Sequence, residues 1–228
     1  MIERFVLYDI DKLRDLFGLK DGVPKGVKIN YNIQPTQTIP VIVQRGENKG
    51  MELMQWGFVP QNAKDMNSVF RYKTHQARSE DVFSRSIWQN AIRTQRCLIP
   101  ANGFYEWRKA PDGKHAFYLH PTNQPLFAFA GIYCEWTDPS GATRSLCAII
   151  TTASDSGSDQ IPSRLPVIVE PAEQASWLDP TVSDVRTLIR IMRPLEPSEL
   201  TVTRVSDAIS STKAKSAELI APLQQPGK

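Results

Sequence analysis

Residues 96–107 of this 228-residue chain read Arg-Cys-Leu-Ile-Pro-Ala-Asn-Gly-Phe-Tyr-Glu-Trp. The apolar first half predicts a buried strand that stops at Pro100, and the Asn-Gly pair predicts a turn into a second strand. Because strand side chains alternate between two faces, Glu106 should lie on the face opposite Tyr105 and Trp107. The stretch therefore predicts a carboxylate held close to a turn and among aromatic rings.

Glu106 has two interpretations. A carboxylate among aromatic side chains tends to have a raised pKa, which suits general acid or base catalysis. The alternative is an ordinary exposed strand residue between inward-facing aromatics. The alternation alone favours this second interpretation.

The composition is that of a soluble globular protein, with 41% hydrophobic and 22% charged residues. A chain of this length can bury a substantial core as one large or two small domains. The formal net charge of +3 permits a polyanionic partner but does not by itself argue for one.

The three cysteines all lie in apolar strand-like runs, which predicts buried reduced thiols without disulfides. The chain start has no signal-peptide pattern, and no apolar run approaches the roughly 18 residues of a membrane span. His75, His115 and His120 lack metal-ligand spacing, and a lone strand histidine is more often structural. We therefore expect a cytoplasmic protein with no metal, no cofactor and no membrane partner.

Short apolar runs separated by turn signals dominate the chain. Besides the pair in residues 96–107, strands are expected at residues 2–7, 39–44, 51–59, 126–136, 145–152, 167–169 and 200–205. Helices are expected at residues 9–17, 76–92, 171–178 and 182–192. With eight to ten strands in all, few helices and no strand–helix alternation, the sheet should be mostly antiparallel. We predict one α+β domain with a barrel-like or strongly twisted sheet.

Arg78, Arg164 and the end of the strand at Thr151 are further candidate site residues. An arginine at an element boundary suits phosphate contacts, because its planar fork donates two parallel hydrogen bonds. Ion pairs with some of the 24 acidic residues are the alternative, and we give the two interpretations equal weight.

A series of short motifs resembles, in order and spacing, the SRAP family of SOS response-associated peptidases, now regarded as sensors of abasic sites in single-stranded DNA. The motifs are Arg4-Phe5, residues 31–36, Trp56-Gly57, Ala77-Arg78-x-Glu80, residues 96–107, residues 129–131, residues 151–153 and Arg164-x-Pro166-Val167-Ile168. The resemblance implies a single SRAP-like α+β domain over residues 1–222, with a twisted, mostly antiparallel β-barrel-like sheet and a few flanking helices. Residues 223–228 are then a short C-terminal tail.

The resemblance also implies a chemistry. Family members bind single-stranded DNA or strand junctions in a basic groove, and a cysteine after the initiator methionine becomes their N-terminal residue. Its amine and thiol capture the aldehyde of an abasic deoxyribose as a thiazolidine crosslink, assisted by an asparagine, a glutamate and a histidine. An α-amine has a pKa well below that of lysine, so it is partly neutral and nucleophilic at pH 7.

This sequence departs from the family pattern at several of those positions. Ile2 stands at the nucleophile position, Gln76 at the asparagine position and Pro162 at the histidine position. A polar residue near Asn62 replaces an aromatic that is frequent in that loop. Glu106 remains as the acid or base.

The resemblance assigns the DNA contacts to the retained arginines and their neighbours. The DNA-binding positions are Arg4, Arg78, Trp107, Thr151 and Arg164. We expect a monomer whose partner is single-stranded or abasic DNA.

Three functions stay open. The first is a DNA-binding protein linked to the DNA damage (SOS) response that has lost stable crosslinking, because Ile2 has no thiol. The second is an abasic-site lyase, in which the N-terminal amine forms a Schiff base and Glu106 moves the proton. The third is a protein-interaction module with a repurposed groove.

Overall fold

Two β-sheets form the framework of the protein, in a computed structural model that describes residues 2–59, 63, 65–154 and 161–223. The first sheet has the strand order β12-β8-β7-β1-β2, and the second has the order β11-β10-β4-β3-β6-β9. The first sheet contains β1 (Phe5–Leu7), β2 (Asn30–Ile33), β7 (Gly103–Ala110), β8 (Gly113–Pro121) and β12 (Leu200–Arg204). The second contains β3 (Thr38–Arg45), β4 (Asn48–Trp56), β6 (Arg96–Ala101), β9 (Phe127–Thr137), β10 (Thr143–Ala153) and β11 (Arg164–Pro166).

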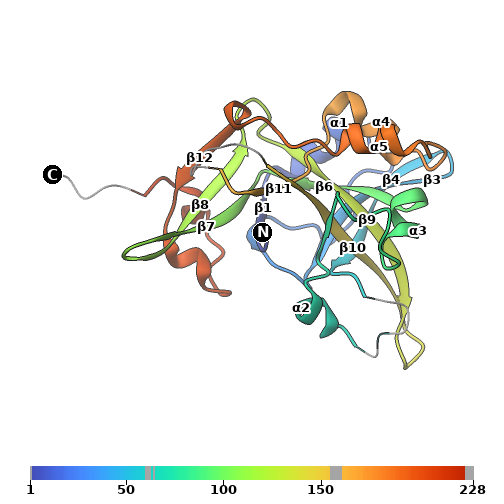
Figure 1. The fold of residues 1–228 in the computed structure, drawn as a ribbon, viewed down its shortest axis with the longest axis horizontal. Helices are drawn as coiled ribbons and strands as arrows, with labels where there is room; N and C mark the ends of the chain where they lie inside the picture. The colour runs from blue at the N-terminus through green and yellow to red at the C-terminus, as the bar shows by residue number, and fades with distance from the viewer. Residues whose placement is uncertain (1, 60–62, 64, 155–160, 224–228) are drawn as a thin grey trace.

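The second sheet closes into a barrel. Strand β9 pairs with both β6 and β10, and β10 also pairs with β4, so the path β10-β4-β3-β6-β9 returns to its start. Among the described pairings only those of β10 with β4 and with β5 (Gln76–Arg78) are parallel. Figure 1 shows β7, β8 and β12 to one side of this barrel. The predicted α+β fold with a barrel-like, mostly antiparallel sheet is confirmed.

Residues 96–107 connect the two sheets. Strand β6 lies in the barrel, β7 lies in the first sheet, and Asn102 stands between them. The buried Asn102 side chain accepts hydrogen bonds from the backbone N–H groups of Tyr8 and Asp9 and donates to the Pro125 carbonyl. The buried Asn102 side chain and the backbone groups around it therefore supply one another's hydrogen-bond partners, as buried polar groups require. The predicted pair of strands is present, but its members belong to different sheets.

Gly103 is required by a close approach. A Cβ atom at this position would lie 2.3 Å from the ring of Tyr118, whose hydroxyl donates a hydrogen bond to the Asn102 carbonyl. Any larger residue would push the ring away from this bond.

Ile2 and Phe5, near the start of the chain, lie in the core. Phe5 packs edge-on against Trp56 and Phe129, with ring centroids 5.1 and 5.7 Å apart. Ile2, only 1% exposed, belongs to the same cluster. Burial of this apolar side chain holds Ile2 against the barrel.

The helices are short and lie outside the sheets. They are α1 (Leu13–Phe17), α2 (Ser68–Tyr72), α3 (Gln89–Thr94), α4 (Gln174–Leu178) and α5 (Val185–Ile191). Figure 1 shows α1, α4 and α5 at one side of the barrel and α2 at the opposite side. None of the helices in the described residues is long and apolar enough to cross a membrane.

The helix expected over residues 76–92 is wrong for residues 76–88, and only the last part of the range is helical. Residues Gln76–Arg78 form β5, because β4 pairs with β10 only at residues 146 and 147 and leaves hydrogen-bond partners for another strand at residues 149–151. Turns follow, and helix α3 begins only at Gln89. The apolar residues do have helical spacing, but at residues 76–78 hydrogen bonds to β10, about 70 residues away in the sequence, form a strand in place of a helix.

Candidate functional site

Three adjoining hollows lie around the segment that precedes β1. The central hollow has a volume of about 530 Å³, and its lining includes Glu3, Arg4, Thr36, Phe70, Lys73 and His75. The Trp107 hollow is lined by Glu3, Arg4, Trp107, Lys114 and Ser210. The Arg164 hollow is lined by residues that include Lys73, Gln76, Arg78, Arg85, Thr151 and Arg164. The hollows share lining residues, and we call the three together the N-terminal groove.

The groove is strongly positive. Six cations and two carboxylates line it: Arg4, Lys73, Arg78, Arg85, Lys114 and Arg164, against Glu3 and Asp81. The difference of +4 exceeds the net charge of +3 for the whole chain. The remaining surface is therefore close to neutral, and the groove concentrates the positive potential where an anionic ligand would lie.

Arg4 and Trp107 form one side of the groove. The Arg4 guanidinium lies 5.8 Å from the centroid of the Trp107 ring and donates a hydrogen bond to Asn32 Oδ1 at 2.7 Å. Trp107 Nε1 donates to Ser210 Oγ at 3.1 Å. Burial lowers the pKa of Arg4, although Glu3 opposes this effect. These contacts hold a cation and a half-buried aromatic surface side by side.

Thr151 organises the opposite side. Strand β10 places Thr151 beside Arg78 of β5 and opposite Pro166 of β11. The buried Thr151 hydroxyl donates to the Ala77 carbonyl and accepts a hydrogen bond from Arg164 at 3.1 Å. Thr151 therefore orients Arg164 and offers little surface of its own.

Arg164 and Arg78 differ in their partners. Arg164 pairs with Glu80 at 2.9 Å. Burial raises the pKa of Glu80, but hydrogen bonds from Arg164 and the backbone outweigh burial and lower it. The guanidinium of the exposed Arg78 has no ion pair among the described residues. The alternative of an ion pair thus applies to Arg164, while Arg78 is available to a ligand.

Glu106 is 8% exposed, so its interpretation as an ordinary exposed strand residue is wrong. It shares the β7 face of Phe104, which packs in the main core, while Tyr105 and Trp107 pack in a second cluster on the other face. The Tyr105 N–H donates to the Arg4 carbonyl at 3.0 Å, which brings this part of β7 next to the first residues of the chain. Glu106 lies beside the N-terminal groove without being one of the residues that line its three hollows.

Comparison with known proteins assigns the chain to a family. The sequence profile described as SOS response associated peptidase (SRAP) matches residues 1–212. The chain belongs to the SRAP family. It is 32% identical over 223 residues to the abasic site processing protein YoqW of Bacillus subtilis (strain 168), covering 96% of this chain and 99% of that protein.

More distant SRAP relatives agree. The chain is 26% identical over 225 residues to the abasic site processing protein HMCES of Gallus gallus, covering 86% of this chain and 66% of that protein. A crystal structure of a protein from Bacteroides thetaiotaomicron has the same fold, with a TM-score of 0.83, 21% identity and 98% of each chain covered.

The substituted SRAP positions are distributed unevenly around the groove. Ile2 is in the core, Gln76 is buried in the Arg164 hollow, and the half-buried Pro162 precedes β11 without lining the groove. The expectation for the loop near Asn62 lies outside the described residues.

No cysteine takes over from Ile2. Burial raises the pKa of Cys97 well above its ordinary value and that of Cys134 to about 12. Burial also raises the pKa of Cys147. All three thiols are therefore protonated at neutral pH and are poor nucleophiles. Within the described part of the chain, no group of three or more histidine, cysteine or acidic residues could hold a metal ion.

His75 is a site residue that the sequence did not reveal. It is 4% exposed, packs edge-on against Trp56 with centroids 5.7 Å apart, and lines the central hollow. Burial lowers the pKa of His75 to about 4; Glu3 raises that pKa and Lys73 lowers it. The ring is therefore neutral at pH 7. A single histidine without ligand spacing gives no sequence signal, and only the fold brings it to the groove.

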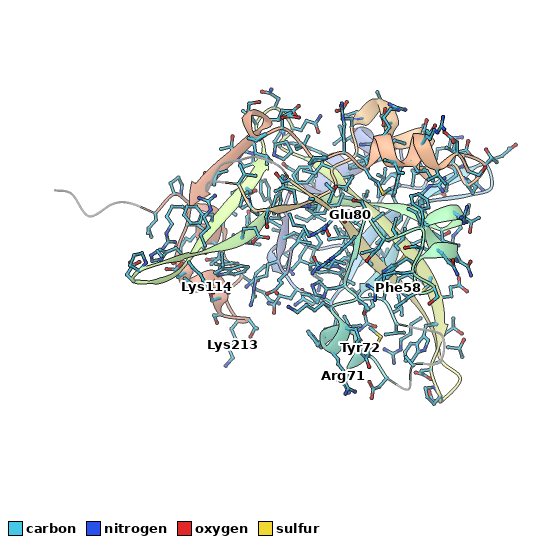
Figure 2. The ribbon with its side chains drawn as sticks, in the orientation of Figure 1. Phe58, Arg71, Tyr72, Glu80, Lys114 and Lys213 are labelled. Carbon is cyan, nitrogen blue, oxygen red and sulfur yellow. The ribbon has the colours of Figure 1, made fainter. Side chains whose placement is uncertain are left out.

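Two exposed aromatic residues of α2 were also missed. Phe70 is 60% exposed and lines the central hollow, and Tyr72 is 64% exposed and lines the Arg164 hollow. Figure 2 shows Arg71 and Tyr72 on α2, at the end of the molecule opposite α4 and α5. Exposed rings beside a positive groove are the elements from which stacking surfaces for bases are built.

Proposed function

We propose that this chain binds single-stranded DNA, including strands that carry an abasic site, in the N-terminal groove. The observation that carries the proposal is the excess of six cations over two carboxylates in a groove whose lining includes exposed aromatic rings. The SRAP relatives that are named abasic site processing proteins support it. The proposal includes a cytoplasmic monomer acting on damaged DNA, as expected from the sequence.

The aromatic residues favour single strands over duplex. Trp107, Phe70 and Tyr72 each line a different hollow of the groove. A base can stack on such a ring only when it is not stacked in a duplex, and each such contact is worth about 1–3 kcal/mol. The cations contact phosphates without reading the sequence, so we expect little sequence preference.

The proposal excludes the stable crosslink that the family resemblance would imply. A thiazolidine needs an amine and a thiol on the same residue, and Ile2 has no thiol. Its side chain is instead part of the core. Since the three cysteines are held protonated by burial, no other thiol is ready to react.

A second candidate function is an abasic-site lyase that uses the N-terminal amine with Glu106. The burial of Glu106 beside the first residues of the chain favours it, because a carboxylate in that place can move a proton for a nearby reaction.

The test is binding of fluorescently labelled oligonucleotides followed by fluorescence anisotropy. We expect undamaged and abasic single strands to bind more tightly than duplex, with affinity falling as salt rises from about 50 to 200 mM. Replacing Arg78 by Ala should weaken binding and reduce the salt slope by about 0.7. The matched control is Arg186→Ala, an exposed arginine of α5 that does not line the groove. Absence of binding at low salt would overturn the proposal in favour of a protein partner.

A further inference from the structure

Glu3 is a carboxylate within an otherwise positive part of the groove. It is exposed and lines both the central hollow and the Trp107 hollow. Among the described residues that line these two hollows it is the only acidic one, against the cations Arg4, Lys73 and Lys114. No hydrogen bond or ion pair joins its carboxylate to another described residue. The carboxylate is therefore open to a ligand that lies in the groove.

A carboxylate at this position selects which part of a nucleic acid strand can lie beside it. A phosphate carries a charge of the same sign and is repelled, so the phosphates should follow the cations of the groove instead. In a single strand the edge of each base is unpaired, and its N–H groups are free to donate hydrogen bonds. The part of a bound strand that faces Glu3 should therefore be the edge of a base.

The Trp107 hollow has the size and the lining of a site for one base. Its volume is about 230 Å³, below the roughly 300–1,000 Å³ of pockets for drug-sized ligands. The half-buried Trp107 ring and the Arg4 guanidinium, 5.8 Å from the ring centroid, are flat groups on which a base can stack. The Ser210 hydroxyl accepts a hydrogen bond from Trp107 Nε1 and can still donate its own proton. The hollow thus combines stacking groups, hydrogen-bond donors and the acceptor oxygens of Glu3.

We propose that the Trp107 hollow binds a guanine base, whose N1–H and N2 amino groups donate two parallel hydrogen bonds to the Glu3 carboxylate. The inference rests on the proposed binding of single-stranded DNA and adds a base preference at one nucleotide of the strand. The phosphate contacts in the rest of the groove carry no sequence information, so the preference is confined to that nucleotide.

Guanine is the base whose edge matches these groups. Its Watson–Crick edge presents two adjacent donors, N1–H and the N2 amino group, and one acceptor, O6. A carboxylate has two acceptor oxygens and can take both donors, as it takes the two N–H groups of an arginine fork. O6 is then left for a donor of the same hollow, such as Lys114 or Ser210. Adenine, cytosine and thymine each present one donor group at this edge, beside an acceptor that a carboxylate repels.

The test measures binding of the full chain to labelled single strands of thymine with one central guanine, adenine or cytosine, by fluorescence anisotropy. We expect the guanine strand to bind about fivefold to tenfold more tightly than the all-thymine strand, the low end of the range for one bidentate base contact. The adenine and cytosine strands should gain less. Equal affinity for the guanine and adenine strands would overturn the proposal, because stacking alone would then explain the gain.

Two analogues of guanine identify the recognised edge. Hypoxanthine lacks the N2 amino group but keeps N1–H and O6, so a strand with hypoxanthine should lose most of the gain. 7-Deazaguanine lacks only the N7 acceptor and keeps the Watson–Crick edge, so it should bind like guanine. The reverse order would place the contact at another edge of the base and overturn the role of Glu3.

Glu3→Gln tests the carboxylate. The amide keeps one acceptor, but its NH₂ group would meet the second donor of guanine, so the preference for guanine should disappear. The all-thymine strand should bind at least as tightly, because a charge that repels phosphates is gone. The thermal unfolding midpoint should stay unchanged, since Glu3 is exposed. A preference for guanine that persists in this variant would overturn the proposal.

The matched control is Glu47→Gln. Glu47 is an exposed carboxylate in the turn between β3 and β4 and does not line the groove. This variant should keep the full preference for guanine. Loss of the preference in both variants would show that net charge, and not the position of Glu3, sets it, and would overturn the proposal.

The outcomes separate this inference from the proposed function. Binding of the all-thymine strand without a gain from guanine would overturn the guanine site and leave the proposed function intact. Failure of the wild type to bind any single strand at low salt would overturn the proposed function and this inference with it.

Discussion

Arg164 donates a hydrogen bond to Glu80 at 2.9 Å, so a carboxylate already occupies one edge of a guanidinium in the groove. Thr151 receives a second hydrogen bond from the same guanidinium at 3.1 Å. The pair fixes the position of Arg164 and reduces the positive charge that this hollow offers to a phosphate. Glu80 therefore limits the affinity of the groove for DNA.

We predict that Glu80→Gln binds single-stranded DNA about twofold to fivefold more tightly, the scale of one partly exposed ion pair. Glutamine keeps one acceptor oxygen, so it can retain the hydrogen bond from the Ala153 N–H, which fixes the loop, while it loses the one from Arg164. The measurement is anisotropy at two salt concentrations. The control is Glu52→Gln, which breaks the ion pair with Arg45 outside the groove. Weaker binding by the Glu80 variant would mean that the ion pair organises the site.

The exposed rings of α2 should contribute to binding without contributing to stability. Phe70→Ala and Tyr72→Ala are each expected to weaken binding to single strands by about 1 kcal/mol or more if the ring stacks on a base. The thermal unfolding midpoint should stay unchanged, because both rings are exposed. Ile189→Ala, an exposed apolar residue of α5, is the control for binding. Unchanged affinity in both aromatic variants would remove α2 from the interface.

His75 should make folding stability depend on pH. Its ring pKa is about 4 in the folded protein and 6.5 when unperturbed, so the unfolded chain binds more protons between these values. The free energy of unfolding keeps its full value above about pH 6.5. It falls by about 3 kcal/mol in total as pH falls towards 4, because the unfolded chain takes up the proton first. Of the described residues, Glu3 and Lys73 are the charged neighbours that act on the ring; Glu3 raises its pKa and Lys73 lowers it.

Urea unfolding of the wild type and of His75→Gln at several pH values between 4 and 7 tests this dependence. The difference between the two free energies of unfolding should narrow steadily as the solution is acidified. Parallel pH profiles for the two proteins would show that the ring is not buried in its neutral form.

The junction at Gly103 should tolerate no side chain. Gly103→Ala places a methyl group 2.3 Å from the Tyr118 ring, so we expect a loss of about 1–3 kcal/mol in the free energy of unfolding. Gly50→Ala in β4 meets no atom within 4 Å and should change stability much less. Equal effects of the two substitutions would refute the close-packing argument.

The sequence was informative where the signal was local. Residues 96–107 predicted two strands and a turn, and α1 ends at Phe17, the last residue of the helix expected at residues 9–17, with Gly18 following in the left-handed conformation. Strand alternation also separated Glu106 from Tyr105 and Trp107 correctly. These features are determined by residues that are close together in the sequence, so sequence patterns can predict them.

The rest depends on contacts between distant residues. Strand β5 forms only because β10 offers it an edge, and Thr151 is buried because Arg164 and Ala77 surround its hydroxyl. The site role of His75 follows from its position in the same hollow as Glu3 and Arg4, which are about 70 residues away in the sequence. No spacing pattern in the sequence predicts contacts between residues that are so far apart along the chain.

We propose that this SRAP protein binds abasic single-stranded DNA without a stable crosslink because Ile2 replaces the nucleophile. The most direct measurement incubates wild type and Ile2→Cys with a labelled abasic single strand and resolves the products on a denaturing gel without borohydride. The account predicts that both proteins bind the strand and that only Ile2→Cys, with amine and thiol on one residue, gives a covalent band. A stable covalent band from the wild type without borohydride would contradict the account.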